Sequence, residues 1–194
     1  MVALCSYIPF GPKRIKLLTS FFGSAKKAWM AGEKKLLEIG LGQKRVSDFI
    51  SFREEFNKDD YFDRLNKLSI NYLTTSDSNY PENLKDLADA PPVLYIKGTI
   101  KQADSNAIAV VGSRKMTSYG KEVCEKFSGE LASYGVTIIS GLARGIDTSS
   151  HKAALIAGGR TIAVLGCGLD SIYPPENYKL AQEISQNGAL ISEY

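Results

Sequence analysis

Short apolar runs alternate with longer amphipathic stretches through the second half of the chain. The apolar runs are rich in β-branched residues and predict strands at 108–111, 136–140, 161–166 and 189–193. Between them, apolar residues recur every three or four positions and predict helices at 119–134, 148–157 and 178–186. Continuous apolar strands joined by helical crossovers predict a doubly wound α/β fold, with a mostly parallel sheet covered on both faces.

Residues 1–70 show a different pattern, with helical spacing and no β-branched runs. They predict a small helical domain of the SAM or helix-hairpin-helix kind. Its opening, around Gly11, has the form of a hairpin turn in which glycine permits a tight bend, and helix packing there is favoured over DNA contact. Segments 70–81 and 90–98 are expected to be extended and to lead into the sheet. The predicted domains are therefore 1–70 and 71–194, the second incomplete at its C-terminal end.

Composition and charge narrow the class of protein. Of the 194 residues, 44% are hydrophobic and 23% charged, as in an ordinary globular protein. The net charge is +3, and the basic surplus lies in residues 1–58, where solvated helix faces explain it better than nucleic-acid binding. Three widely spaced cysteines form no disulfide framework, and the sequence has neither an apolar run of about 20 residues nor a signal peptide. We expect a cytoplasmic protein without a membrane span.

Glycine-rich segments follow three successive predicted strands. The first strand leads into 112–114, the second into 140–147 and the third into 166–168. Because the carboxyl ends of parallel strands and the N-termini of the following helices share one edge of a sheet, these segments predict an anion pocket. Glycines there would let a bulky anion approach the backbone, and serines would add hydroxyl donors. Arg114 and Arg144 would supply planar guanidinium groups suited to phosphate.

Three further residues carry expectations about this pocket. Asp147 could serve as the N-cap of the helix predicted to begin at Thr148. His151, the only histidine, could face the pocket or lie on the helix surface. Arg160 lies outside the strand-end segments, and we expect its removal to have little effect on binding.

Motifs for cofactor binding and catalysis are missing from the sequence. There is no G-x-G-x-x-G after the first strand and no G-x-x-x-x-G-K-[ST] segment. Histidine and cysteine form no metal-ligand cluster, and no paired carboxylates stand at a strand end. The sequence therefore predicts a binding protein with no catalytic residue, cofactor or metal.

The glycine-rich segments, with the residues that follow them, resemble the DNA-processing protein A (DprA/Smf) family. The likeness is carried by Gly112-Ser-Arg114, Tyr119-Gly120, Ser140-Gly-Leu-Ala-Arg-Gly-Ile-Asp147, His151, Gly166-Cys-Gly-Leu-Asp170, Tyr173-Pro174, Asn177 and Ser192-Glu-Tyr194. The resemblance implies an extended Rossmann-like domain that binds single-stranded DNA, forms a homodimer and loads the RecA recombinase in natural transformation. The DNA-binding residues it implies are Gly112, Ser113, Arg114, Ser140, Gly141, Ala143, Arg144, Gly145, Asp147, Gly166, Gly168 and Asn177.

The sequence departs from that family at two places. Some relatives have a lysine directly after the Tyr-Pro pair, where this chain has Pro175, and Lys179 is the candidate substitute. Family members also continue past the position of Tyr194 with further strands and a Phe-Pro-x-Arg-Asn segment, so we expect the last strand here to leave an open sheet edge.

Two other functions remain open. One is a nucleoside-phosphate hydrolase of the lysine-decarboxylase-like group, although its Pro-Gly-Gly-x-Gly-Thr-x-x-Glu segment is missing. The other is an interaction module that has lost DNA binding, which the balanced charge of residues 101–194 would suit.

Overall fold

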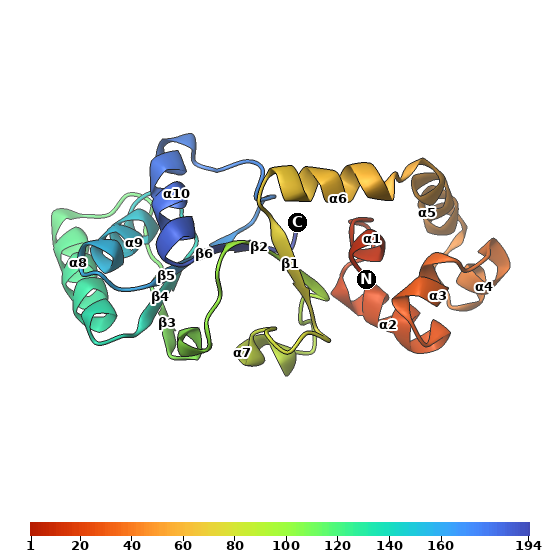
Figure 1. The fold of residues 1–194 in the computed structure, drawn as a ribbon, viewed down its shortest axis with the longest axis horizontal. Helices are drawn as coiled ribbons and strands as arrows, with labels where there is room; N and C mark the ends of the chain where they lie inside the picture. Colours follow the sequence, from red (N-terminus) through yellow and green to blue (C-terminus); the bar gives the residue numbers. More distant parts are fainter.

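The computed structural model describes all 194 residues as a mixed six-stranded sheet with flanking helices, preceded by a helical region (Figure 1). The helices of the first region are α1 (Val2–Cys5), α2 (Pro12–Phe22), α3 (Ala25–Trp29), α4 (Glu33–Glu38), α5 (Gln43–Glu55) and α6 (Lys58–Lys67). The strands are β1 (Asn71–Thr74), β2 (Val93–Gly98), β3 (Ala107–Ala109), β4 (Thr137–Ser140), β5 (Thr161–Leu165) and β6 (Ala189–Ser192). The remaining helices are α7 (Glu82–Lys85), α8 (Ser118–Ser133), α9 (Ile146–Ile156) and α10 (Tyr178–Asn187), with short 3-10 turns η1 (Gln102–Ser105) and η2 (Pro175–Asn177).

The strands lie in the order β1-β2-β6-β5-β4-β3. Strands β3 to β6 are parallel, as the sequence predicts, and β1 and β2 add to them in antiparallel orientation. The last strand, β6, therefore lies between β5 and β2. The expectation of an open edge at the end of the chain is wrong, because the earlier extended segment 93–98 occupies that edge. The free edges are β1 and β3.

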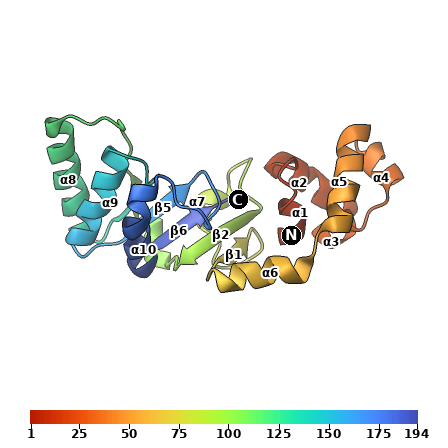
Figure 2. The same ribbon diagram turned by 90° about the horizontal axis from the view of Figure 1, so that it is seen from above.

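The crossover helices α8, α9 and α10 lie side by side on one face of the parallel strands (Figure 2). Ala163, Leu165 and Leu190 point to this face and are buried beneath helix residues such as Ile184. The opposite face is less covered, and Val164 there is 45% exposed. The Rossmann-like α/β fold is thus confirmed, but the expectation that helices cover both faces of the parallel strands is wrong: the strands follow one another in sequence order across the sheet, so all three crossover helices lie on the same face.

Helix α8 packs through a different face from the apolar repeat that predicts it. Cys124, Ser128 and Ala132 are buried against α9, whereas Tyr119 is 76% and Phe127 59% exposed. Small side chains allow the two helices to approach closely, and Cys124 Sγ lies 3.5 Å from the carbonyl oxygen of Ile146. The repeat therefore locates the helix correctly but does not identify its buried side.

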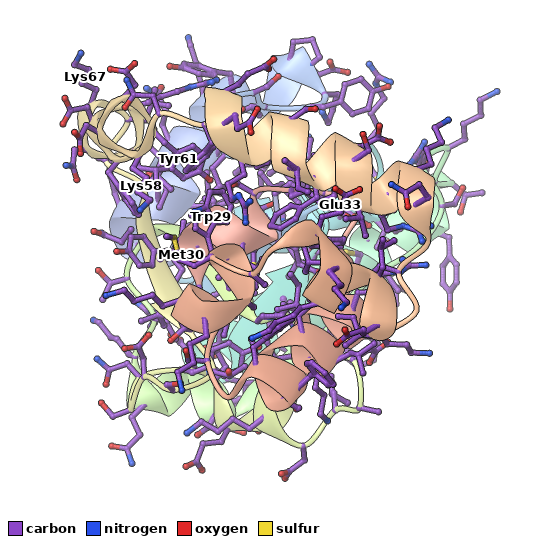
Figure 3. All side chains as sticks on the ribbon, turned by 90° about the vertical axis from the view of Figure 1, so that its right-hand side faces the viewer. Trp29, Met30, Glu33, Lys58, Tyr61 and Lys67 are labelled. Carbon is purple, nitrogen blue, oxygen red and sulfur yellow. The ribbon has the colours of Figure 1, made fainter.

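The helical region has an aromatic core. The rings of Tyr7, Phe10 and Phe49 lie with centroids 4.7 to 5.3 Å apart, and Trp29 packs edge-on against Phe49. Figure 3 faces this region and shows Trp29 among the helices and Lys67 at the outer side of α6. Gly11 caps α2 with a φ of −61°, so this turn does not need the left-handed conformation that favours glycine.

Helix α6 joins the helical region to the sheet. The hydroxyl groups of Tyr61 and Tyr95 lie 2.7 Å apart, and Arg64 pairs with Asp170 in the loop after β5. Burial raises the pKa of Tyr95, because the phenolate would be poorly solvated there. Val2 and Ile70 pack in the same apolar cluster as the strands. The two predicted domains thus share an apolar contact, and the division at residue 70 stays a prediction.

Arg160 joins several segments at the end of the sheet where the parallel strands begin. Its guanidinium donates to both carboxylate oxygens of Asp104 at 2.8 Å and to the carbonyl oxygens of Thr99 and Asn187. Burial alone would raise the pKa of Asp104, but the hydrogen bonds from Arg160, the Lys101 amide and Thr137 lower it overall. Loss of Arg160 would leave a buried carboxylate without its cation and cost about 3 kcal/mol or more. Arg160 is therefore unsuitable as a neutral control for binding.

His151 is fully buried between α9 and the sheet, so neither expected position, in the pocket or on the helix surface, is correct. Its Nδ1 atom lies 2.6 Å from the hydroxyl of Thr161, and that hydroxyl donates to the carbonyl oxygen of Ile138. The Thr161 oxygen must then accept from His151, which places the proton on Nδ1. Nε2 is buried without a partner, and burial lowers the pKa of His151 to about 4.

We predict a loss of stability in mild acid that depends on His151. A folded pKa of about 4 against an unfolded value of 6.5 means that neutral His151 stabilises the fold above pH 6.5, and that this stabilisation is lost as pH falls toward 4. Between pH 7 and pH 5 the free energy of unfolding should fall by about 2 kcal/mol from this group. Urea unfolding of the chain and of His151→Gln, which does not titrate, measures the difference. Equal pH dependence of the two proteins would contradict it.

Candidate functional site

A pocket of about 290 Å³ opens where the loops after β3, β4 and β5 meet. Its lining residues are Arg114, Gly141, Ala143, Arg144, Leu165, Gly166, Cys167, Tyr173 and Pro174. Five of these are among the predicted site residues, because the parallel strands carry the three loops to one edge of the sheet. The sequence places Tyr173 only within a family motif, although an aromatic residue beside the third glycine loop is a signal for a stacking surface.

The loop after β4 folds around Asp147. The Asp147 carboxylate accepts hydrogen bonds from the amides of Gly141 at 3.1 Å and Ala143 at 3.4 Å. Helix α9 begins at Ile146, and Gly145 occupies the N-cap position, so the expected N-cap role of Asp147 is wrong. Asp147 instead lies in the first turn of α9, is 7% exposed, and accepts the hydrogen bonds of these loop amides from the protein interior. These two amides are thereby directed away from a ligand in the pocket.

Asn177 fixes the same loop from the other side. Its side-chain amide donates to the carbonyl oxygen of Leu142 and to the hydroxyl of Thr148, both at 2.8 Å. Thr148 in turn donates to the carbonyl oxygen of Ala143 at 2.6 Å. Leu142 has a φ of +57°, which is uncommon for a residue with a side chain, and its side chain is fully buried. Hydrogen bonds on both sides therefore hold the loop in one conformation.

Most of the predicted glycines lie where a side chain would overlap another part of the protein. A Cβ on Gly145 would lie 2.2 Å from the carbonyl oxygen of Ser113, and a Cβ on Gly112 would lie 2.7 Å from the side chain of Ile146. A Cβ on Gly141 would lie 2.8 Å from the Asp147 carboxylate. Gly166 differs, since a Cβ there would meet nothing within 4 Å, and it lines the open pocket.

The remaining predicted residues lie around the pocket in different environments. The Ser140 hydroxyl is buried and donates to the carbonyl oxygen of Val110 at 2.6 Å, so it joins the ends of β4 and β3. Ser113 is exposed, and its oxygen accepts from the amide of Lys115. Gly168 packs close to the carboxylate of Asp170. Lys179 is exposed in the first turn of α10 and does not line the pocket.

The two arginines of the pocket differ in their partners. Arg114 is exposed, and its side chain forms no ion pair and no hydrogen bond with the rest of the protein. Arg144 donates from Nε to Oε1 of Glu176 at 2.5 Å, and its guanidinium carbon lies 5.8 Å from the centre of the Tyr173 ring. The hydrogen bond from Arg144 lowers the pKa of Glu176. The pocket thus holds one cation without a protein partner and one already paired.

No group of three or more histidine, cysteine, aspartate and glutamate residues in the structure is arranged to hold a metal ion. None of its helices combines the length and the apolar character required to cross a bilayer.

The region that contains this pocket matches a known protein family. Residues 71–194 match the model of the family described as DNA recombination-mediator protein A. The chain belongs to this family.

Individual relatives agree with the family match. Protein Smf from Synechocystis is 38% identical over 189 residues, covering 95% of this chain and 48% of the relative. DNA processing protein DprA from Bacillus subtilis is 41% identical over 126 residues, covering 64% of this chain and 42% of the relative. The chain therefore spans about half the length of the curated family members that it matches.

Solved structures of the family show the same fold. DNA processing protein A from Streptococcus pneumoniae superposes with a TM-score of 0.72 at 34% identity, over 84% of this chain and 56% of that one. The Helicobacter pylori protein superposes with a TM-score of 0.57 at 38% identity, over 64% of this chain and 55% of that one, and its structure is described as showing a unique single-stranded DNA binding mode.

We predict that Gly145 is more sensitive to substitution than Gly135, a glycine of similar φ that has no packed neighbours. Gly145 and Gly135 both have positive φ, 79° and 82°, but only Gly145 has neighbours within reach of a Cβ. Gly135→Ala should cost about 1–2 kcal/mol of unfolding free energy, and Gly145→Ala a further 1–3 kcal/mol, because a ψ of −127° at Gly145 disfavours any side chain and its Cβ would overlap Ser113. Chemical denaturation of both variants measures the difference. Equal costs would show that the two loops are not packed as described.

Proposed function

We propose that this chain binds single-stranded DNA at the strand-end pocket, with Arg114 as the main contact to a phosphate. The observation that carries the proposal is the exposed guanidinium of Arg114, which lies without a protein partner beside a pocket at the carboxyl edge of a parallel sheet. A guanidinium can donate two parallel hydrogen bonds to phosphate oxygens. The contacts of its loop with Gly145 and Ile146 would hold the backbone at Arg114, so that its side chain is the part ordered on binding.

The charge distribution favours a single strand over a duplex. Residues 101–194 carry as many acidic as basic side chains, so they offer no broad basic face to follow the two backbones of a duplex. A flexible strand can instead place individual phosphates and bases against a small pocket. The description of the Helicobacter pylori relative as a single-stranded DNA-binding protein supports the same choice.

We assign the predicted residues to two roles. Arg114, Arg144 and Gly166 line the pocket and Ser113 is exposed beside it, and none of them makes the contacts that hold the loop after β4, so these four would contact the strand. The supporting residues, which shape and hold the loops, would be Gly112, Ser140, Gly141, Ala143, Gly145, Asp147, Gly168 and Asn177. Lys179 would reach only DNA that extends beyond the pocket.

The wider role we propose is that of a mediator that binds DNA in the cytoplasm without catalysing a reaction. The protein would act as a homodimer and deliver the strand to RecA in natural transformation, which are the roles that the resemblance to the DprA/Smf family implies. The family description as a recombination mediator supports the delivery role, and the Bacillus subtilis and Streptococcus pneumoniae relatives are named DNA processing proteins.

We predict that Arg114→Ala weakens binding of a fluorescent oligothymidine by about 10- to 100-fold, because it removes charge-assisted hydrogen bonds to phosphate. The slope of log affinity against log salt concentration should also become less negative by about 0.7. Fluorescence anisotropy at low and moderate salt, beside the matching duplex, measures both quantities.

Lys126→Ala is the matched control for this test. Lys126 is exposed on α8, does not line the pocket and makes no ion pair, so its loss changes the net charge equally. Equal weakening by both substitutions would contradict the pocket assignment. Absence of binding by the folded wild-type chain, checked by circular dichroism, would contradict the proposed function of this chain.

A further inference from the structure

The pocket contains an exposed aromatic ring whose role is not explained by a phosphate contact. Tyr173 lies in the loop after β5 and is 60% exposed, although it lines the pocket beside Arg114 and Arg144. The next residue, Pro174, is buried and anchors the chain directly after the ring. The ring is therefore held at the rim of the pocket and not packed into the core.

The guanidinium of Arg144 is held close to this ring. Its central carbon lies 5.8 Å from the ring centre, within the range of a cation–π contact. The ion pair with Glu176 fixes Arg144 from the side, and this contact raises the pKa of Arg144. The same pair partly neutralises Arg144, which leaves Arg114 as the unpaired cation for phosphate. A planar cation and an aromatic ring therefore lie together at the rim of the pocket that Arg114 also lines.

We propose that Tyr173 is the stacking surface for one nucleobase of the bound strand, with Arg144 positioned by Glu176 beside the same base. This inference rests on the proposed binding of single-stranded DNA. Every base has a flat π-face, so stacking on Tyr173 would add affinity without selecting a sequence. Arg114 would hold the phosphate and Tyr173 the base, and the two contacts would act on different parts of a nucleotide.

The test compares two strands that carry the same phosphates. One is a fluorescent oligothymidine, and the other is an abasic strand of equal length with tetrahydrofuran in place of each nucleoside. The protein variants are Tyr173→Leu, which removes the ring, and Tyr173→Phe, which keeps it. Circular dichroism and thermal unfolding confirm that each variant is folded.

We expect Tyr173→Leu to bind oligothymidine about 5- to 150-fold more weakly than the wild-type chain, and to bind the abasic strand almost unchanged. Tyr173→Phe should retain most of the affinity for oligothymidine. By contrast, Arg114→Ala should weaken binding of both strands, because both carry phosphates.

Two results would overturn the inference while leaving the proposed function intact. One is wild-type affinity of Tyr173→Leu for oligothymidine, and the other is equal weakening of its binding to both strands. If the folded wild-type chain bound neither strand, the proposed function itself would be contradicted, and the stacking role with it.

Discussion

The site depends on the carboxylate of Asp147, which holds the loop after β4 in shape. The carboxylate accepts hydrogen bonds from the amides of Gly141 and Ala143, so the loop folds around it. On the other side of the loop, Asn177 and Thr148 donate to the carbonyl oxygens of Leu142 and Ala143. This arrangement allows Gly145 to touch the loop after β3. Arg144 belongs to the same loop and lines the pocket. Asp147 does not line the pocket, but by shaping this loop it determines the position of Arg144.

A rigid frame and an exposed cation suit the binding of a flexible ligand. The amides of Gly141 and Ala143 already donate to Asp147, so in the loop after β4 they add little to the attraction for an anion, which comes mainly from Arg114 and from groups at the rim. The Arg160–Asp104 pair lies where the parallel strands begin, whereas the pocket lies where they end. One end of the sheet therefore carries a partly buried ion pair that stabilises the fold, and the other end carries Arg114, a cation without an ion-pair partner.

The α/β pattern, the parallel orientation of the four strands and their approximate bounds could be predicted from the sequence, because strand and helix periodicities are local properties. The same is true of the presence of Arg114, Arg144 and the glycine loops at one sheet edge, since parallel strands require it. Membership of the family followed from motifs that the chain carries in order, and the family comparison confirms it.

Only the tertiary structure decided which side of each element is buried and which groups are already paired. The large apolar repeat of α8 is exposed because the close contact with α9 requires the small residues on its other side. His151 is buried because it bonds to Thr161 in the next strand. Asp147 faces its own loop because the chain folds back and brings the amide of Gly141 to its carboxylate. Likewise, Glu176 pairs with Arg144, 32 residues away, and leaves Arg114 free. Such pairings depend on the meeting of remote segments, which local sequence patterns do not encode.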